Sequence, residues 1–342
     1  MAETKKIKVA INGFGRIGRA AFKIALEKPE LEVVAINDLT EPNILAHLLA
    51  HDTAYGNYRK SVSIEGNHLS VDGKLYQVFA EPDPAKLPWK NLEVDVVLEC
   101  TGRFTDKTAA SVHISAGAKN VILSAPVKGD DDSLPTYLIG ANADAYAGES
   151  VISNASCTTN SLAPVAKIIH EHFGIEKALM TTVHSYTADQ SLQDGPHKDL
   201  RRARAAAQNI VPTTTGAAIA VTQVMPELKD KFDGLSIRVP TVVVSISDCT
   251  FLLKKKTSKE EINTVLTEAS RNPRYAHVLA VTNEPLVSSD FIGDPHSSIV
   301  DLSLTKVIDG DLVKIVAWYD NEWGYSNRLV EMALLLGPTS RQ

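Results

Sequence analysis

One cysteine of this chain stands in a setting that favours chemical reactivity. The segment "SNASCTTNS" (153–161) surrounds Cys157 with small polar residues, and an apolar helical pattern over 160–173 follows directly. A thiol at the start of a helix meets unpaired N–H groups and the positive end of the helix dipole, which lower its pKa and favour the nucleophilic thiolate. Position alone leaves two interpretations open, a nucleophile or a small buried residue near a domain joint.

A histidine further along the chain supplies the thiol with a partner. His184 lies 27 residues beyond Cys157 and ends an apolar strand pattern in the segment "TTVHSYTADQ" (181–190). A cysteine and a histidine on separate elements are the common arrangement of an activated thiol. We therefore predict that Cys157 is the nucleophile and that His184 activates it. Cys100 and Cys249 fall within strand patterns, so we predict that they are structural.

The segment "INGFGRIGR" (11–19) is the second motif that carries chemistry. Gly13, Gly15 and Gly18 have the G-x-G-x-x-G spacing between a predicted strand and a predicted helix, and Asp38 ends the next strand, 20 residues beyond Gly18. Such glycines permit a tight turn and the close approach of a pyrophosphate, to which the helix N-terminus offers free N–H groups. Asp38 would accept hydrogen bonds from the adenosine ribose and repel a 2′-phosphate, which predicts NAD rather than NADP as the cofactor.

A nicotinamide cofactor together with an activated cysteine indicates one kind of reaction. The thiolate attacks an aldehyde, and the resulting thiohemiacetal loses a hydride to NAD and leaves a thioester. A histidine takes the hydroxyl proton as a base and can stabilise the oxyanion as a donor. Water would release the thioester as an acid, and phosphate would release it as an acyl phosphate.

Loops rich in Thr, Ser and Arg indicate two anion sites. Hydroxyls, backbone N–H groups and guanidinium forks are the usual phosphate ligands. Each cluster alone also fits a subunit contact or a helix cap, whereas together they favour a phosphorylated substrate. The candidates are Thr187, Arg201, Arg202, Arg204, the segment from Thr213 to Gly216, and Arg238.

The strands and helices expected around these residues follow different patterns in the two halves of the chain. Before residue 157, near-continuous Val/Ile/Leu runs alternate with helical patterns, which predicts an α/β domain with a Rossmann-type, doubly wound parallel sheet. The segment 61–81 has the pattern of antiparallel hairpins. Beyond residue 157, longer strand patterns and separate helices predict an α+β domain with a mostly antiparallel sheet. The strands predicted in the first half are 7–12, 31–38, 94–102, 120–126 and 137–142.

Composition restricts the possible functions. The chain has 342 residues, 44% of them hydrophobic, and a formal net charge of −6, which is typical of a soluble protein of more than one domain. The acidic balance argues against a dedicated nucleic-acid or membrane-surface binder, and no apolar run reaches the roughly 20 residues of a membrane-spanning helix. The N-terminus leads directly into a predicted strand without a signal peptide, and three widely spaced cysteines indicate neither disulfides nor zinc. We expect a cytoplasmic protein without a metal.

Taken together, these motifs resemble the phosphorylating glyceraldehyde-3-phosphate dehydrogenase family. The resemblance implies that a homotetramer converts glyceraldehyde 3-phosphate, NAD and inorganic phosphate to 1,3-bisphosphoglycerate and NADH in glycolysis or gluconeogenesis. It also implies an NAD-binding domain (1–156), a catalytic domain (157–319), and a C-terminal helical segment (320–342) that packs back onto the first. The matching segments are "INGFGRIGR", "INDL", "ASCTTN", "HSYTADQ", "DLRRARAAA", "TTTGAA", "RVPT" and "WYDNEWGYSNR".

The resemblance assigns roles position by position. Cys157 matches the family's nucleophile, and His184 matches the residue that activates it. Thr187 and Arg238 match the substrate-phosphate site, and the site of the attacking phosphate is matched by Ser156, Thr158, Arg202, Thr215 and Gly216. The cofactor contacts are matched by Arg16 and Ile17 in the glycine turn, Asp38 at the ribose, and Ser124, Asn321 and Tyr325 around the nicotinamide.

Two other functions stay open from the sequence. Erythrose-4-phosphate dehydrogenase has the same Cys–His pair and glycine motif but hydrolyses its thioester; the intact "HSYTADQ" and "TTTGAA" segments favour the phosphorylating enzymes. The second is an NAD- or RNA-binding protein with Cys157 as a redox sensor. No basic or aromatic pattern marks an RNA-binding groove.

Overall fold

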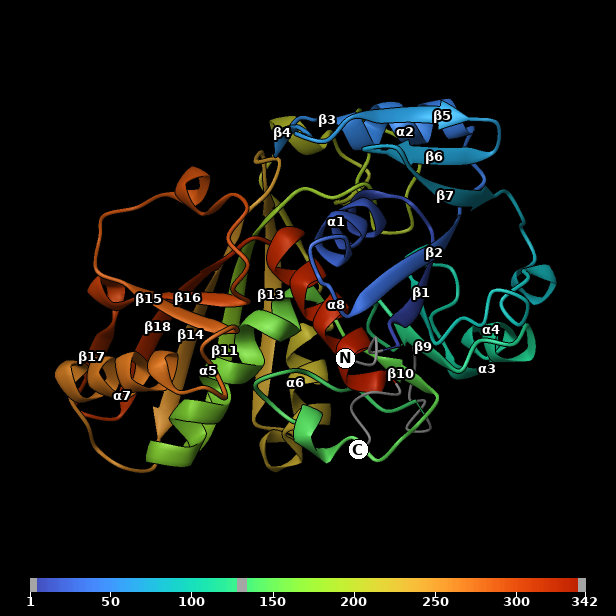
Figure 1. Ribbon diagram of the computed structural model, residues 1–342. Helices are drawn as coiled ribbons and strands as arrows, with labels where there is room; N and C mark the ends of the chain where they lie inside the picture. Colours follow the sequence, from blue (N-terminus) through green and yellow to red (C-terminus); the bar gives the residue numbers. More distant parts are fainter. Residues whose placement is uncertain (1–4, 128–133, 338–342) are drawn as a thin grey trace. The chain divides into compact units, whose positions relative to one another are not determined.

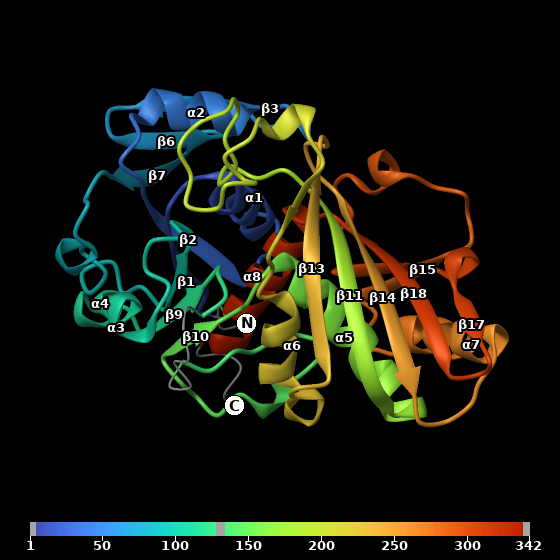
Figure 2. The ribbon, with the colours of Figure 1, turned by 180° about the vertical axis from the view of Figure 1, so that it is seen from behind.

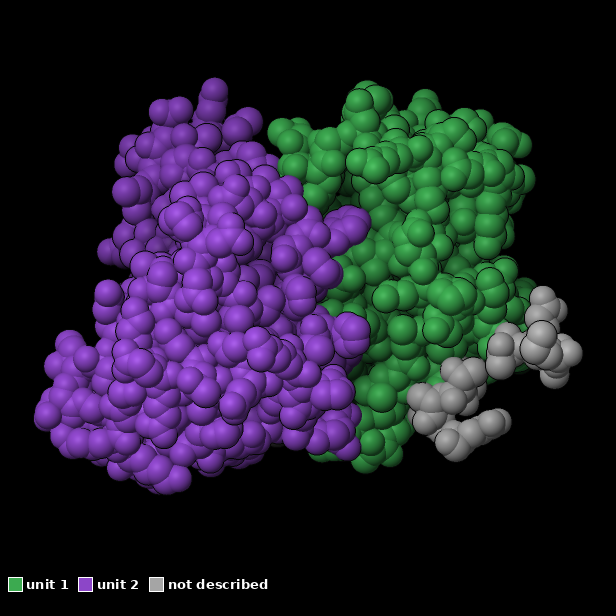
Figure 3. All heavy atoms as spheres, turned by 60° about the vertical axis from the view of Figure 1, so that its left-hand side comes forward, with its two compact units in different colours: residues 1–137, 145–155, 326–342 green, residues 138–144, 156–325 purple. Residues whose placement is uncertain are grey.

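The computed structural model describes residues 5–127 and 134–337, and the chain forms two compact units. The first unit combines residues 1–137, 145–155 and 326–342, and the second combines residues 138–144 and 156–325 (Figure 3). Residues 338–342 of the predicted C-terminal segment lie outside the described residues.

A sheet of eight strands forms the centre of the described part of the first unit (Figure 1). The strand order is β10-β9-β8-β1-β2-β7-β6-β5; the pairs from β10 to β7 are parallel, and β7-β6-β5 are antiparallel. The predicted parallel sheet and the predicted hairpins of 61–81 are therefore confirmed. The strands are β1 (Ile7–Asn12), β2 (Leu31–Asn37), β5 (Val62–Glu65), β6 (His68–Val71), β7 (Lys74–Phe79), β8 (Val96–Glu99), β9 (Asn120–Leu123) and β10 (Val151–Ser153).

Helices and aromatic side chains cover this sheet. Phe22 of α1 packs edge-to-face on Phe14 and Tyr76, with ring centroids 5.4 and 5.0 Å apart. Gly337, directly after α8, packs closely on β1, because a Cβ atom on this glycine would lie 2.1 Å from Cδ1 of Ile7. The elements are α1 (Arg16–Ala25), α2 (Pro42–Ala50), α3 (Lys107–Ala110), α4 (Val112–Ser115) and α8 (Trp323–Leu336), with a small sheet of β3 (His51–Asp52) and β4 (Gly56–Asn57).

One predicted strand of the first half is wrong. Residues 137–142 form a turn, in which the Leu138 carbonyl accepts hydrogen bonds from the N–H groups of residues 141 to 143 and Gly140 has a φ of +80°. The Asn142 side chain closes this turn by accepting a hydrogen bond from the N–H of Leu138 at 2.9 Å. The parallel sheet instead takes β10 as its edge strand, which the sequence pattern missed because it has only three residues.

The second unit has its own sheet, in the order β12-β13-β11-β14-β18-β16-β15, with β17 paired to β18. Five of its seven strand pairs are antiparallel, as predicted. The strands are β11 (Ile175–Ser185), β12 (Val211–Thr213), β13 (Phe232–Val239), β14 (Ser245–Leu253), β15 (Leu279–Thr282), β16 (Ser298–Asp301), β17 (Lys306–Ile308) and β18 (Leu312–Tyr319).

Three helices accompany this sheet: α5 (Cys157–Phe173), α6 (Ala217–Val224) and α7 (Lys259–Arg271). The helix α5 packs against β11, β14, β16 and β18, and Figures 1 and 2 show it from opposite sides. Burial alternates along β11, so that Ala178, Met180, Thr182 and His184 are buried on one face. None of the described helices is both long enough and apolar enough to cross a membrane.

Candidate active site

The start of α5 and the end of β11 bring Cys157 and His184 together. Ser156 caps α5, because its hydroxyl accepts a hydrogen bond from the N–H of Thr159 at 3.1 Å, and Cys157 is the first residue of the helix. His184 is the last but one residue of β11. Its Nε2 atom lies 3.5 Å from Sγ of Cys157, so the structure brings the two predicted residues within contact.

The hydrogen bonds of His184 fix which ring nitrogen carries the proton. Nδ1 lies 2.6 Å from the carbonyl oxygen of Ser185, which can only accept, so Nδ1 must donate. Nε2 of the neutral ring therefore presents a lone pair to the thiol. The ring of Tyr319 lies edge-on to the imidazole, with the centroids 6.0 Å apart, and restricts its rotation.

The expected lowering of the Cys157 pKa is wrong. Burial raises the pKa of this thiol, and the Arg238 guanidinium, the Thr158 hydroxyl and the N–H groups at the start of α5 oppose that shift only in part. Burial also lowers the pKa of His184 to about 3, and Arg238 and Arg202 act in the same direction. Thiol and imidazole are therefore both neutral at pH 7, and His184 can take the thiol proton during the reaction.

Burial acts on the other two cysteines as well. It raises the pKa of Cys100 to about 12, with the Glu99 carboxylate acting in the same direction. It also raises the pKa of Cys249, in β14, where the neighbouring Asp248 adds to the effect. Neither cysteine interacts with a histidine among the described residues, which agrees with the structural role that we predict for them.

Tyr319 is a part of the site that the sequence did not reveal. Its buried hydroxyl lies 2.9 Å from Oγ1 of Thr158 and 2.8 Å from Oγ1 of Thr182. This chain of three hydroxyls ties the first turn of α5 to β11 and β18. The segment "WYDNEWGYSNR" contains Tyr319, but only the tertiary pairing of β14 with β18 shows what it contacts.

The guanidinium groups of Arg238 and Arg202 lie near Cys157 and His184, and they differ in how many of their N–H donors have acceptors within the protein. Nη1 of Arg238 donates to Oγ1 of Thr187 at 3.1 Å and to the Ser185 carbonyl at 3.3 Å. Its Nε is buried and has no hydrogen-bond partner among the described residues. A buried cationic donor without an acceptor is suited to bind an anion.

Arg202 is held more completely. Its Nε donates to Oγ1 of Thr213 at 2.9 Å, its Nη2 donates to the Thr214 carbonyl at 3.1 Å, and its Nη1 pairs with the Asp189 carboxylate. The sequence reasoning did not assign a role to Asp189. The structure thus places Arg202 beside the predicted segment from Thr213 to Gly216.

Thr215 and Gly216 start α6. The hydroxyl of Thr215 accepts a hydrogen bond from the N–H of Ala217 at 3.2 Å, and Gly216 is the N-cap residue. A Cβ atom on Gly216 would meet no atom within 4 Å, so the space beside this backbone is open. A helix N-terminus with open space beside it suits a phosphate oxygen.

In the first unit, the glycine turn has the geometry that a dinucleotide requires. Gly13 has a φ of +94°, and a Cβ atom on it would lie 2.7 Å from the backbone nitrogen of Thr101. A Cβ atom on Gly18 would lie 2.0 Å from the Gly13 carbonyl oxygen, which explains why helix and turn pack closely there. A Cβ atom on Gly15, by contrast, would meet no atom within 4 Å, so the space beside this backbone is open to a ligand.

A cavity of about 350 Å³ lies beside this turn. Its wall includes Asp38, whose carboxylate accepts hydrogen bonds from the N–H groups of Phe14 at 2.7 Å and Thr40 at 2.9 Å. The carboxylate is thereby fixed and retains lone pairs for ribose hydroxyls. The residues that line the cavity are Asn12, Gly13, Gly15, Asn37, Asp38, Leu39, Glu81, Pro82, Pro84, Cys100, Thr101, Arg103 and Phe104.

The remaining predicted cofactor residues lie in both units. Arg16 and Ile17 begin α1, and Nη1 of Arg16 pairs with the Asp52 carboxylate at 2.6 Å. Ser124 directly follows β9, and its N–H donates to the Glu99 carbonyl at 3.0 Å. In the second unit, Asn321 follows β18, and Tyr325 is a buried residue of α8. No cluster of three or more His, Cys, Asp or Glu side chains within the described ranges could hold a metal ion.

Two family models match the chain. The model "Glyceraldehyde 3-phosphate dehydrogenase, NAD binding domain" matches residues 7–107, and the model of the C-terminal domain matches residues 156–321. The chain belongs to the glyceraldehyde 3-phosphate dehydrogenase family. The family resemblance inferred from the motifs is therefore confirmed.

Several relatives of this family are similar over nearly their whole length. The glyceraldehyde-3-phosphate dehydrogenase of Geobacillus stearothermophilus is 54% identical over 329 residues, which are 96% of this chain and 97% of that protein. Glyceraldehyde-3-phosphate dehydrogenase 1 of Bacillus subtilis is 53% identical over the same shares of both chains. The enzyme of Zymomonas mobilis is 52% identical over 335 residues, 97% of this chain and 99% of that protein.

Proposed function

We propose that this protein catalyses the NAD-dependent oxidative phosphorylation of glyceraldehyde 3-phosphate to 1,3-bisphosphoglycerate, in glycolysis or gluconeogenesis. Family membership supports the reaction and the cofactor, and names of the relatives favour neither erythrose-4-phosphate oxidation nor an RNA-binding role. The observation that carries the mechanism is the 3.5 Å approach of His184 Nε2 to Cys157 Sγ.

In the first step, Cys157 adds to the aldehyde carbon. Its thiol proton passes to Nε2 of His184, because that lone pair faces the sulfur. The protonated imidazole then gives the proton to the former carbonyl oxygen, and a thiohemiacetal results.

In the second step, the thiohemiacetal is oxidised to a thioester. His184 takes the hydroxyl proton as the carbon–hydrogen bond breaks. NAD, when bound, supplies the hydride acceptor. Inorganic phosphate then attacks the thioester carbonyl, and the carbon–sulfur bond breaks to return the Cys157 thiolate and release the acyl phosphate.

We assign the substrate phosphate to Thr187 and Arg238, supported by the buried Nε of Arg238, which has no acceptor among the described residues. The attacking phosphate is assigned to Ser156, Thr158, Arg202, Thr215 and Gly216, supported by the helix starts of α5 and α6. For NAD, the assigned contacts are Gly13, Gly15, Arg16, Ile17, Gly18, Asp38, Ser124, Asn321 and Tyr325, supported by the open turn at Gly15. We retain 1–156 with 320–342 as the NAD-binding domain and 157–319 as the catalytic domain.

The test of this function is the dependence of NADH formation on phosphate. We expect the purified protein to reduce NAD with glyceraldehyde 3-phosphate when phosphate or arsenate is present, and to stop after about one NADH per site when both are absent. A single turnover is expected because the thioester on Cys157 then has no acceptor. Equal steady-state rates with and without phosphate would contradict the proposal and favour hydrolysis.

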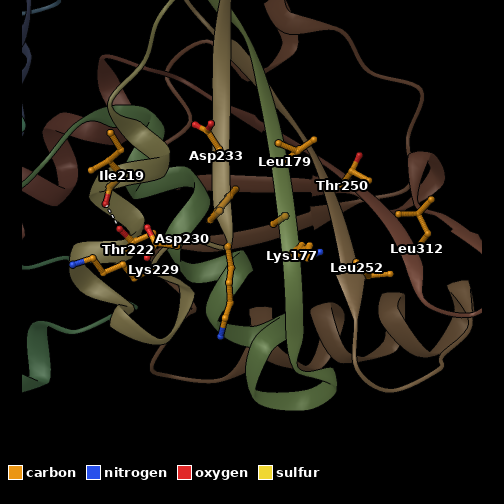
Figure 4. Close-up of a pocket in the computed structure, with 13 residues that line it drawn as sticks. Lys177, Leu179, Ile219, Thr222, Lys229, Asp230, Asp233, Thr250, Leu252 and Leu312 are labelled. Carbon is orange, nitrogen blue, oxygen red and sulfur yellow. Dashed lines mark hydrogen bonds between the residues drawn. The ribbon is translucent and has the colours of Figure 1, made fainter.

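We further propose that the protein is a homotetramer in the cytoplasm, where the Cys157 thiol stays reduced. An apolar face formed by the second sheet and α6 supports self-association: Leu179 and Leu235 of the sheet are 66% and 45% exposed, and Ile219 of α6 is 64% exposed. This face borders a cavity of about 770 Å³, and Figure 4 shows Leu179, Leu252 and Leu312 along its strands. Light scattering should give four chain masses for the wild type and fewer for Leu179→Asp.

A further inference from the structure

Ser185, the residue after His184, forms hydrogen bonds through its N–H, its carbonyl and its hydroxyl. The N–H of Ser185 donates to Oγ of Ser245 at 3.1 Å, and its carbonyl accepts from Nδ1 of His184 at 2.6 Å. Its own hydroxyl donates to the Val244 carbonyl at 2.7 Å and therefore accepts the hydroxyl hydrogen of Thr241, also at 2.7 Å. The orientation of the His184 imidazole thus depends on where Ser245 holds the peptide of Ser185.

The Ser245 hydroxyl makes a second hydrogen bond, to a residue assigned to the nicotinamide. Its Oγ lies 2.9 Å from Oδ1 of Asn321. Ser185, Ser245 and Asn321 are all buried. Because Oδ1 of an amide can only accept, the Ser245 hydroxyl donates its one hydrogen to Asn321, while its oxygen accepts the N–H of Ser185. This fixes the amide of Asn321 with Nδ2 as its remaining donor, and Nδ2 has no hydrogen bond to another described residue.

The sheet explains how one hydroxyl reaches both groups. Ser245 is the first residue of β14, which lies between β11 and β18. Its register partner on β18 is Tyr319, two residues before Asn321, and the end of β11 runs beside it on the other side. The ends of β11 and β18 and the start of β14 therefore meet at one edge of the sheet.

The backbone that enters β14 is strained at this point. Val244 has a φ of +72°, a conformation that β-branched residues rarely adopt. The Ser185 hydroxyl holds the Val244 carbonyl in place. Surrounding contacts thus keep a strained residue directly before Ser245, which sets the direction of its side chain.

We propose that Ser245 is a positioning residue that orients the base and the cofactor-binding amide together. Its accepted hydrogen bond holds Ser185, and through it Nδ1 of His184; its donated hydrogen bond occupies Oδ1 of Asn321 and leaves Nδ2 as the donor that would meet the carboxamide of bound NAD. The proposal rests on the proposed function, because it concerns residues assigned there to the reaction. It adds a single side chain that couples the two halves of the chemistry.

The experiment compares Ser245→Ala with Ser247→Ala. Ser247 is a matched control, since it is a buried serine of the same strand whose hydroxyl has no hydrogen-bond partner among the described residues. Two measurements are made on the full-length protein without substrate. The first is the Kd for NAD by titration, which reports on Asn321, and the second is the rate of Cys157 alkylation by iodoacetamide across pH 6–9, which reports on His184.

For Ser245→Ala we expect the Kd for NAD to rise about tenfold and the alkylation rate at neutral pH to fall by about fivefold, the size of one or two lost hydrogen bonds. Ser247→Ala should stay within about twofold of the wild type in both measurements. Combining Ser245→Ala with Asn321→Ala should add less than about twofold to the Kd of Asn321→Ala alone, because the hydroxyl acts through that amide.

A change in only one measurement, an additive double variant, or an equal change in Ser247→Ala would overturn the proposal. If Ser245→Ala is not recovered folded, Ser245→Cys is judged by the same criteria, since a thiol is nearly the same shape but a weak donor. The proposed function fails separately, if the wild type neither binds NAD nor forms NADH in a phosphate-dependent way. If the wild type binds NAD and forms NADH in a phosphate-dependent way, but Ser245→Ala has an unchanged Kd and alkylation rate, only this inference is refuted.

Discussion

Nε2 of His184 lies 3.5 Å from Sγ of Cys157, while Nδ1 of the same ring donates a hydrogen bond to the next carbonyl along the chain. This arrangement gives the thiol a neutral base with a fixed direction. The activation of Cys157 therefore depends on proton transfer to His184, because burial and the helix N-terminus do not together lower the pKa of the isolated thiol.

Replacing the nucleophile should stop the reaction without removing the cofactor. For Cys157→Ser we expect NADH formation to fall by at least about 1,000-fold, since a serine hydroxyl has a far higher pKa than a thiol. The Kd for NAD, measured by titration, should change by less than about threefold. Wild-type turnover in this variant would contradict the mechanism.

The buried imidazole should make the protein sensitive to acid. The pKa of His184 is about 3 when folded and about 6.5 when unfolded, so the unfolded state takes up its proton first as the pH falls. The contribution of the neutral, buried imidazole to the unfolding free energy is fully present above about pH 6.5 and is lost as the pH falls toward 3. Between pH 7 and pH 4, the wild type should lose up to about 3 kcal/mol more unfolding free energy than His184→Asn.

Denaturant unfolding at several pH values measures this difference. The exposed His172 offers a control, because His172→Asn should follow the wild-type pH dependence. Parallel curves for wild type and His184→Asn would show that the imidazole is not held neutral in the folded protein.

The guanidinium of Arg238 should be specific for the substrate phosphate. Arg238→Lys keeps the charge but loses the fork that reaches Thr187 and offers the buried Nε. We expect the KM for glyceraldehyde 3-phosphate to rise about tenfold or more, with the KM for NAD changed less than about twofold. Arg204→Lys is the matched control, since Arg204 forms an exposed pair with Asp194. Equal effects of the two substitutions would refute the assignment.

The hydroxyl of Tyr319 should matter for stability in a way that a second buried tyrosine does not. Tyr319→Phe leaves Thr158 and Thr182 without their shared partner and should cost about 1–3 kcal/mol of unfolding free energy. Tyr275→Phe should be neutral or stabilising, because the buried Tyr275 hydroxyl has no partner among the described residues. A loss of the same size in both variants would show that the hydroxyl chain contributes nothing.

Much of the fold was predictable, because the local hydrophobic patterns and helix caps favour the same strands and helices that pack together in the folded protein. Strand β1 matches its predicted range, and the Ser156 cap places Cys157 at the first position of α5. The strand predicted at 137–142 failed for a local reason, the side-chain hydrogen bond of Asn142 that closes a turn. The missed strand β10 is too short to carry a periodic pattern and exists only because β9 pairs with it.

Local sequence was enough to predict the groups that we propose to react: a cysteine at a helix start, a histidine at a strand end, and a glycine turn with an acid 20 residues on. These features depend on backbone conformation and spacing, which neighbouring residues specify. The protonation of these groups could be understood only from the fold, because burial and Arg238 shift the pKa values of Cys157 and His184. Likewise, Ser245 meets both Ser185 and Asn321 only because β14 lies between β11 and β18, and no local pattern records that adjacency.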